Sequence, residues 1–104
     1  MRVYQLKVEG IDMMLEPVFA SREKAEEYIR NKYLNRKISI KQTNIEPSEY
    51  VYRILVSDSE GYELKEEIYT NLDTAKENIV ADNEKVVKEN ILKDSVKTIE
   101  LSEV

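Results

Sequence analysis

Alternating apolar and polar positions near the start of the chain predict a β-strand. In the segment VYQLKV, the apolar residues Tyr4, Leu6 and Val8 alternate with Gln5 and Lys7. Successive side chains of a strand point to opposite faces, so the three apolar residues should share one buried face of a sheet. We expect the other face, which carries Gln5 and Lys7, to be half exposed.

The pattern returns 48 residues further along as VYRILV, in which Tyr52, Ile54 and Val56 hold the matching positions. Each copy is followed by a turn that contains one of the chain's two glycines, and then by a second apolar pattern, which together predict a β-hairpin. Pro17 lies in the second strand of the first copy and has no N–H to donate to a ladder. We therefore expect that strand at the edge of a sheet.

Two related segments then predict helices, VFASREKAEEYI at 18–29 and IYTNLDTAKENI at 68–79. Ser21 and Asn71 hold equivalent positions just before each helical pattern, and both residue types are favourable N-caps. Apolar residues spaced three or four apart give each helix one stripe that can pack on a sheet.

The second helix is predicted to be the longer one, over 72–92 against 22–34 for the first. Its apolar stripe continues along the chain, and glutamate–lysine pairs at i, i+4 spacing support a helix there. A potential break lies at Asp82–Asn83. After the helices, the sequence predicts strands at 37–45 and 95–101.

These elements predict an α+β protein made of a tandem β-β-α-β repeat, in which two helices pack on a mainly antiparallel sheet of up to six strands. Since about 50 residues bury too little surface to be stable alone, we expect residues 1–104 to form one domain from repeats 1–46 and 50–104. Two separate small domains and a ferredoxin-like arrangement are alternatives. The predicted core positions are Tyr4, Leu6, Val8, Ala25, Ile29, Tyr52, Ile54, Val56, Ala75 and Ile79.

The first copy resembles small modules found in phage and prophage proteins of unassigned function. The matching residues are Val3, Tyr4, Leu6, Val18, Phe19, Ser21, Ala25 and Tyr28. The second copy departs from this pattern, because Asn71 and Asn78 replace the serine and the second tyrosine. The resemblance covers about half of the chain and implies a mobile-element origin, but it carries no catalytic residues.

Composition narrows the chemistry. The chain has no Cys and no His, which excludes disulfides, thiol chemistry and the ordinary zinc, copper and haem sites. It has no glycine-rich phosphate-binding motif and no nucleophile–base spacing of a known kind. We therefore expect no enzymatic activity, no metal and no cofactor. The N-terminal segment lacks the apolar run of a signal peptide, and no segment is apolar enough to span a membrane, so a cytoplasmic protein is expected.

Charge is distributed unevenly and suggests a partner. Residues 1–50 carry nine Lys/Arg and eight Asp/Glu, a net charge of +1, whereas residues 51–104 carry seven and thirteen, a net charge of −6. We expect the second half to present an acidic face that binds a basic groove of another protein. Tyrosines such as Tyr62, or the segment Met13–Leu15, would supply the apolar contacts. Alternatively, these acidic residues simply form the solvated edge of a hairpin. The candidate partner-binding residues are Asp58, Glu60, Tyr62, Glu63 and Glu67.

Two further groups of charged residues have competing interpretations. The basic segment 30–41 lies near two tyrosines, a combination that can bind nucleic acid, although a solvated helix end also explains it. Glu16 and Glu66 recur at one position of the two copies, where carboxylates could act in acid–base chemistry or guard an edge strand against aggregation. The candidate nucleic-acid residues are Arg30, Lys32, Arg36, Lys37 and Lys41.

If the basic segment binds nucleic acid, the affinity should fall steeply with salt because binding releases counterions from the phosphates. The double variant Arg36→Glu/Lys37→Glu should then abolish binding in an electrophoretic mobility-shift assay. An unchanged mobility of single- and double-stranded oligonucleotides at about 50 mM salt, where non-specific binding is strong, would exclude this function.

Overall fold

The computed structural model of the protein describes residues 1–93, 102 and 103 and has an α+β fold, as the sequence predicts. The expected strand at 95–101 lies outside the described residues. The elements in chain order are β1 (Arg2–Val8), β2 (Met13–Phe19), α1 (Arg22–Lys32), β3 (Ile38–Asn44), β4 (Tyr50–Asp58), β5 (Gly61–Leu64), α2 (Leu72–Glu77), β6 (Glu84–Leu92) and β7 (Ser102–Glu103).

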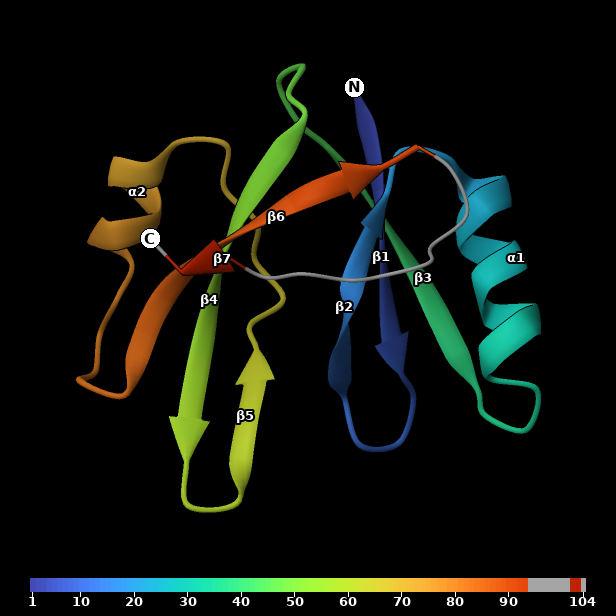
Figure 1. Ribbon diagram of the computed structural model, residues 1–104, viewed down its shortest axis with the longest axis horizontal. Helices are drawn as coiled ribbons and strands as arrows, with labels where there is room; N and C mark the ends of the chain where they lie inside the picture. Colours follow the sequence, from blue (N-terminus) through green and yellow to red (C-terminus); the bar gives the residue numbers. More distant parts are fainter. Residues whose placement is uncertain (94–101, 104) are drawn as a thin grey trace.

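Six strands form one mixed, mainly antiparallel sheet in the order β3-β1-β2-β6-β4-β5, and β7 pairs with β6 (Figure 1). β1 is antiparallel to β2 and β3, and β4 is antiparallel to β5 and β6. A short parallel contact, in which Val18 and Phe19 of β2 lie beside Ile91 and Leu92 of β6, joins these two groups of strands. We refer to residues 1–49 as the N-terminal half and to residues 50–103 as the C-terminal half.

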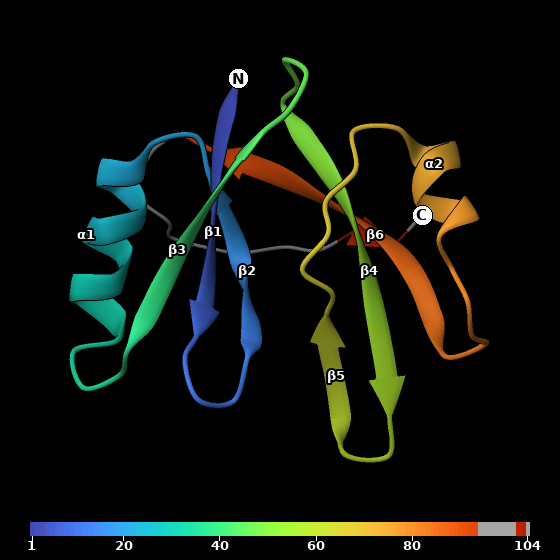
Figure 2. The same ribbon diagram turned by 180° about the vertical axis from the view of Figure 1, so that it is seen from behind.

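The two helices lie on opposite sides of the molecule and cover the outer faces of the strands (Figures 1 and 2). α1 packs through Ala25 and Tyr28 onto the apolar face of β1. α2 packs through Ala75 onto Tyr52 of β4 and Val86 of β6. Neither helix is long and apolar enough to cross a membrane.

Both predicted N-caps are confirmed. The Oγ atom of Ser21 accepts a hydrogen bond from the backbone N–H of Lys24 at 3.4 Å, and Oδ1 of Asn71 accepts one from Thr74 at 3.1 Å. These bonds satisfy N–H groups that have no partner inside the first turn of a helix. The sequence therefore fixes where both helices begin.

The predicted extent of the second helix is wrong. α2 ends at Glu77, and residues 84–92, expected to be helical, form strand β6. β-branched residues such as Val86 and Val87 favour a strand, and pairing with β4 satisfies the backbone of this segment. Glu84, which could pair with Lys88 along a helix, instead pairs with Lys65, just beyond the end of β5, at 2.9 Å.

Seven of the ten predicted core residues are buried, and Ile29, Val56 and Ile79 are half-buried. The second face of β1 is the part of the core that the pattern did not predict. Gln5 on that face is completely buried rather than half exposed. A strand that is buried on both faces cannot be recognised from the alternation of apolar and polar residues, because that pattern arises only when one face is exposed to solvent.

The faces of β1 and β4 that point away from the helices meet between the two halves. Val3 and Val18 of the N-terminal half form one apolar cluster with Val51 and Ile91 of the C-terminal half. A second cluster joins Met14 to Leu64 and Val87. This central layer also changes the position expected for β2, which is not an edge strand, since its last two residues pair with β6.

A fragment of residues 1–46 should be largely unfolded, because Val3 and Val18 would lose the residues that cover them and Gln5 would be exposed. The dispersion of backbone amide protons in a two-dimensional NMR spectrum measures this directly, with the full chain as the control. A well-dispersed spectrum of the fragment would mean that the halves fold independently.

Candidate functional site

A buried ion pair lies in the central layer. Nη1 of Arg53, in β4, is 2.9 Å from Oε2 of Glu89 in β6, and the two side chains are 0% and 3% exposed. The same Nη1 donates to the backbone carbonyls of Leu15 and Glu16 in β2, at 3.2 and 3.0 Å. The pairing of β1 with β2 shifts register in this region. Arg53 therefore ties the C-terminal half to the backbone of β2 where its ladder is irregular.

Gln5 makes the converse connection. Its Nε2 atom donates to the backbone carbonyl of Glu66, in the segment that follows β5, at 3.0 Å. We call Gln5, Arg53 and Glu89 the central polar cluster. β1 and β4, the middle strands of the two groups, thus each contribute one buried polar side chain that bonds to the backbone of the other half.

The central polar cluster is incompletely paired. Oε1 of Gln5, Nε and Nη2 of Arg53 and Oε1 of Glu89 are buried without a hydrogen-bond partner among the described residues. Burial raises the pKa of Glu89 to about 7, an effect that the nearby guanidinium of Arg53 opposes. The cost of burying a carboxylate therefore outweighs its attraction to one cation.

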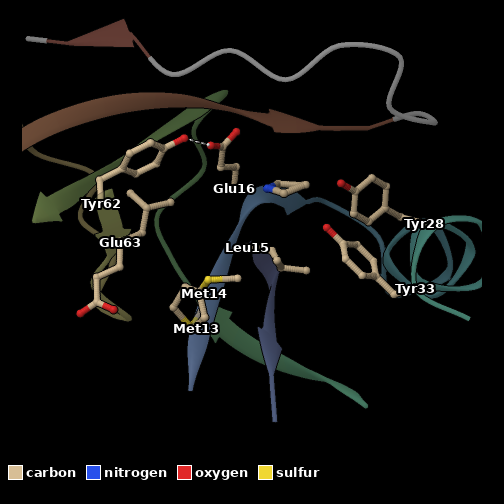
Figure 3. A pocket seen from close by; sticks show the side chains of 10 residues that line it. Met13, Met14, Leu15, Glu16, Tyr28, Tyr33, Tyr62 and Glu63 are labelled. Carbon is tan, nitrogen blue, oxygen red and sulfur yellow. Dashed lines mark hydrogen bonds between the residues drawn. The ribbon is translucent and has the colours of Figure 1, made fainter. Parts of the chain in front are cut away.

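A pocket of about 370 Å³ opens between β2, β5 and α1 (Figure 3). We call it the tyrosine pocket, because three tyrosines line it together with apolar side chains and two glutamates. Among the described residues, its lining contains neither Lys nor Arg. The lining residues are Met13, Met14, Leu15, Glu16, Pro17, Tyr28, Tyr33, Tyr62, Glu63 and Leu64.

Glu16 and Tyr62 bridge the pocket across the two halves. The Tyr62 hydroxyl donates to Oε1 of Glu16 at 2.9 Å, the bond drawn as a dashed line in Figure 3. This bond to a carboxylate raises the pKa of the Tyr62 hydroxyl. Tyr62 is 60% exposed, so its ring forms an open wall of the pocket. The second carboxylate oxygen of Glu16 has no hydrogen-bond partner among the described residues.

Tyr28 and Tyr33 of the α1 region form the opposite wall, and their hydroxyls point toward the pocket (Figure 3). The ring centroids lie 5.9 Å apart. Burial, and then the proximity of Tyr33 and Glu16, raises the pKa of Tyr28 to about 12. The Tyr28 hydroxyl therefore keeps its proton at physiological pH.

The predicted partner-binding residues are only partly brought together. Tyr62 and Glu63 line the tyrosine pocket, beside the Met13–Leu15 segment that was expected to provide apolar contacts. Asp58 is the last residue of β4 and Glu60 lies in the turn that follows; both are exposed, and Oδ1 of Asp58 accepts from the N–H of Glu60 at 2.8 Å.

Glu67 is exposed but lies beyond the end of β5 at Leu64. Strand alternation, which would place Glu63, Lys65 and Glu67 on one face, therefore does not extend to Glu67. Lys65 is instead held by Glu84.

The predicted nucleic-acid residues are separated by their contacts. Arg30 and Lys32 lie at the end of α1, and Arg36 and Lys37 lie exposed in the loop that follows. Lys41 of β3 is 3.0 Å from Glu66. Lys32 sits 5.4 Å from the centroid of the Tyr28 ring, which is itself buried. Tyr28 consequently offers no free face on which a base could stack.

The recurring glutamates have different environments. Glu66 pairs with Lys41 at 3.0 Å and with Lys7 at 3.8 Å, and Lys41 lowers its pKa. Glu16 faces the tyrosine pocket instead. The two carboxylates have no common partner among the described residues, so they do not form a catalytic pair there. The described residues also contain no group of three or more acidic side chains arranged to hold a metal ion.

Sequence reasoning missed three participants in these sites. Arg53 and Glu89 were passed over because they were assigned to an ordinary strand and a helix face. Tyr33 was considered only as part of the basic segment. The available signal is that Gln5 and Arg53 are polar residues at matching positions of the segments VYQLKV and VYRILV.

Comparisons with protein-family models, with curated proteins and with solved structures found no match.

The stability of the protein should depend on Glu89 in a defined pH range. The pKa of Glu89 is raised from 4.5 to about 7 in the folded state, so the folded protein holds a proton that the unfolded chain releases. This contribution is fully present below pH ~4.5 and is lost as the pH rises through ~7, by up to about 3 kcal/mol.

Urea unfolding of wild type and Glu89→Gln at about pH 5 and about pH 8 measures the effect. Glutamine has the same shape but does not titrate, so wild type should lose stability relative to the variant as the pH rises. A difference in unfolding free energy that stays constant with pH would contradict the assignment.

Proposed function

We propose that this protein is a non-enzymatic protein-interaction module, an inhibitor or accessory protein that binds a basic segment of another protein. The observation that carries the proposal is the tyrosine pocket. It combines exposed apolar surface, from Tyr62 and the 37% exposed Met13, with the carboxylates of Glu16 and Glu63. Apolar anchors inside a charged rim are the usual composition of a protein-binding surface.

The position of the hairpins supports the same function. The β1–β2 and β4–β5 hairpins end on the same side of the molecule in both ribbon views (Figures 1 and 2). We call Asp58, Glu60 and Glu63, all on the β4–β5 hairpin, the acidic surface. A basic partner segment that approaches this end meets the acidic surface next to the pocket, and the charge complementarity would speed association and select the partner.

Nucleic-acid binding through the basic segment has weaker support. Lys41 forms an ion pair with Glu66, and the ammonium of Lys32 lies over the ring of Tyr28. The chain also carries a net charge of −5, which disfavours approach to phosphate. We therefore favour a protein as the partner.

We also infer that the chain is a tandem duplication of a β-β-α-β unit. The order strand–strand–helix–strand occurs twice, and in each set the first strand lies between the other two. Gln5 and Arg53, at matching positions, bond to the carbonyls of Glu66 and Glu16, which also match. Such reciprocal bonding is expected for two copies related by approximate two-fold symmetry. After duplication, only the second copy would have become acidic.

The proposed function predicts that the protein binds basic peptides through the acidic surface. An array of short peptides with matched apolar content and basic, neutral or acidic charge measures this. Basic peptides should bind best, and Glu60→Lys/Glu63→Lys should weaken that binding by about tenfold or more at low salt, because like charges now face the peptide.

The matched control is Asp73→Lys/Glu77→Lys. It makes the same change in net charge at two exposed residues of α2, a helix that lies away from the tips of the hairpins (Figure 1). An equal loss of affinity in both double variants would mean that net charge alone drives binding. Equal binding of basic and acidic peptides by wild type would overturn the proposed function.

A further inference from the structure

We propose that the tyrosine pocket binds the side chain of an arginine contributed by the partner. This inference rests on the proposed function and names the group that enters the pocket. The pocket volume of about 370 Å³ lies in the range of sites that enclose a small ligand.

The floor of the pocket suits the aliphatic part of such a side chain. Leu15 and Leu64 are buried, Pro17 is among the most fully buried side chains, and Met14 packs in the cluster with Leu64 and Val87. The three methylene groups of an arginine would be covered by these apolar atoms. Methionine is flexible and adapts to the shape of an incoming group.

The polar groups of the pocket suit a cation with several N–H donors. One oxygen of Glu16 accepts from Tyr62, and the other, which has no hydrogen-bond partner among the described residues, can accept from a ligand. The hydroxyl oxygens of Tyr28 and Tyr33 point into the same space (Figure 3), and the high pKa of Tyr28 keeps its hydroxyl neutral. Because the lining contains no Lys or Arg among the described residues, nothing in it compensates the charge of Glu16.

The placement of hydrogen-bond acceptors on two sides of the pocket favours a guanidinium over an ammonium. Glu16 and Tyr62 contribute oxygens on one side, and Tyr28 and Tyr33 contribute hydroxyl oxygens on the other. A planar guanidinium presents five donors at its rim and can reach acceptors on both sides, whereas an ammonium is a compact and more strongly hydrated charge. The ring of Tyr62, which is 60% exposed, also offers stacking surface to a guanidinium.

Tyr62 acts here as a positioning residue. Its hydroxyl donates to one carboxylate oxygen of Glu16 and so holds that carboxylate beside the pocket. Since Tyr62 comes from β5 and Glu16 from β2, the site is complete only when the two halves are packed together. The central polar cluster, in which Arg53 holds the backbone of Glu16 at 3.0 Å, supports that packing from inside.

The test uses the peptide acetyl-Gly-Leu-Arg-Leu-Gly-amide and the same peptide with citrulline, which has the shape of arginine without its charge. The chain has three methionines, so methyl-labelled methionine gives few NMR signals. Met13 and Met14 line the pocket, whereas Met1 lies near Ile45 and serves as an internal control.

The arginine peptide should shift the signals of Met13 and Met14 in a saturable manner and leave Met1 unchanged. The citrulline peptide should bind about tenfold more weakly, as expected for the loss of a charge-assisted hydrogen bond. Glu16→Gln should cause a similar loss, and Tyr62→Phe a smaller one. Glu46→Gln, an exposed glutamate outside the pocket, should leave the affinity unchanged, and amide spectra should show that every variant is folded.

Equal affinity for the arginine and citrulline peptides, or wild-type affinity in Glu16→Gln, would overturn the inference. Tighter binding of the corresponding lysine peptide would overturn the choice of guanidinium. If basic peptides bind the acidic surface without shifting Met13 or Met14, the arginine pocket fails and the proposed function stands. If basic peptides do not bind at all, both fail.

Discussion

The structure depends on the packing of β1 against β4 through faces that point away from the helices. Valines from both halves make this contact, and Arg53 of β4 has a completely buried side chain. A buried cation is tolerated only where acceptors surround it, and Arg53 finds them in Glu89 and in two carbonyls of β2. The interaction therefore restricts how the two halves can be placed, since another register would leave the charge unpaired.

That placement creates the tyrosine pocket. Arg53 bonds to the backbone of Glu16, and the side chain of the same residue faces outward to Tyr62. One residue thus connects the buried layer with the surface site. The pocket walls come from α1 and β5, which are far apart in the sequence, and each wall is anchored by a different apolar cluster. Changes in the central layer should consequently reach the pocket through β2.

Charge has different roles in the two layers. Inside, burial dominates, and it raises the pKa of Glu89 despite the adjacent arginine. At the surface, ion pairs such as Lys41–Glu66 are solvated and contribute little to stability. In the acidic surface on the β4–β5 hairpin, Asp58 accepts a hydrogen bond within its own turn, whereas Glu60 and Glu63 form no ion pair among the described residues. Glu63 lines a pocket whose lining lacks positive charge, which is why we relate this surface to a basic partner.

The sequence by itself determined the local features: the alternation of Tyr4, Leu6 and Val8, the hairpin turns, and the N-caps Ser21 and Asn71. These depend on neighbours within a few residues, so periodicity and capping rules suffice to predict them. Tertiary structure alone decided that residues 84–92 form a strand. The local sequence is compatible with either a helix or a strand, and pairing with β4 selects the strand. Tertiary structure also decided the burial of Gln5, Arg53 and Glu89 and the meeting of Glu16 with Tyr62. The bonds of Gln5 and Arg53 to backbone carbonyls and the bond between Tyr62 and Glu16 join residues from opposite halves, and no local pattern records how two halves pack.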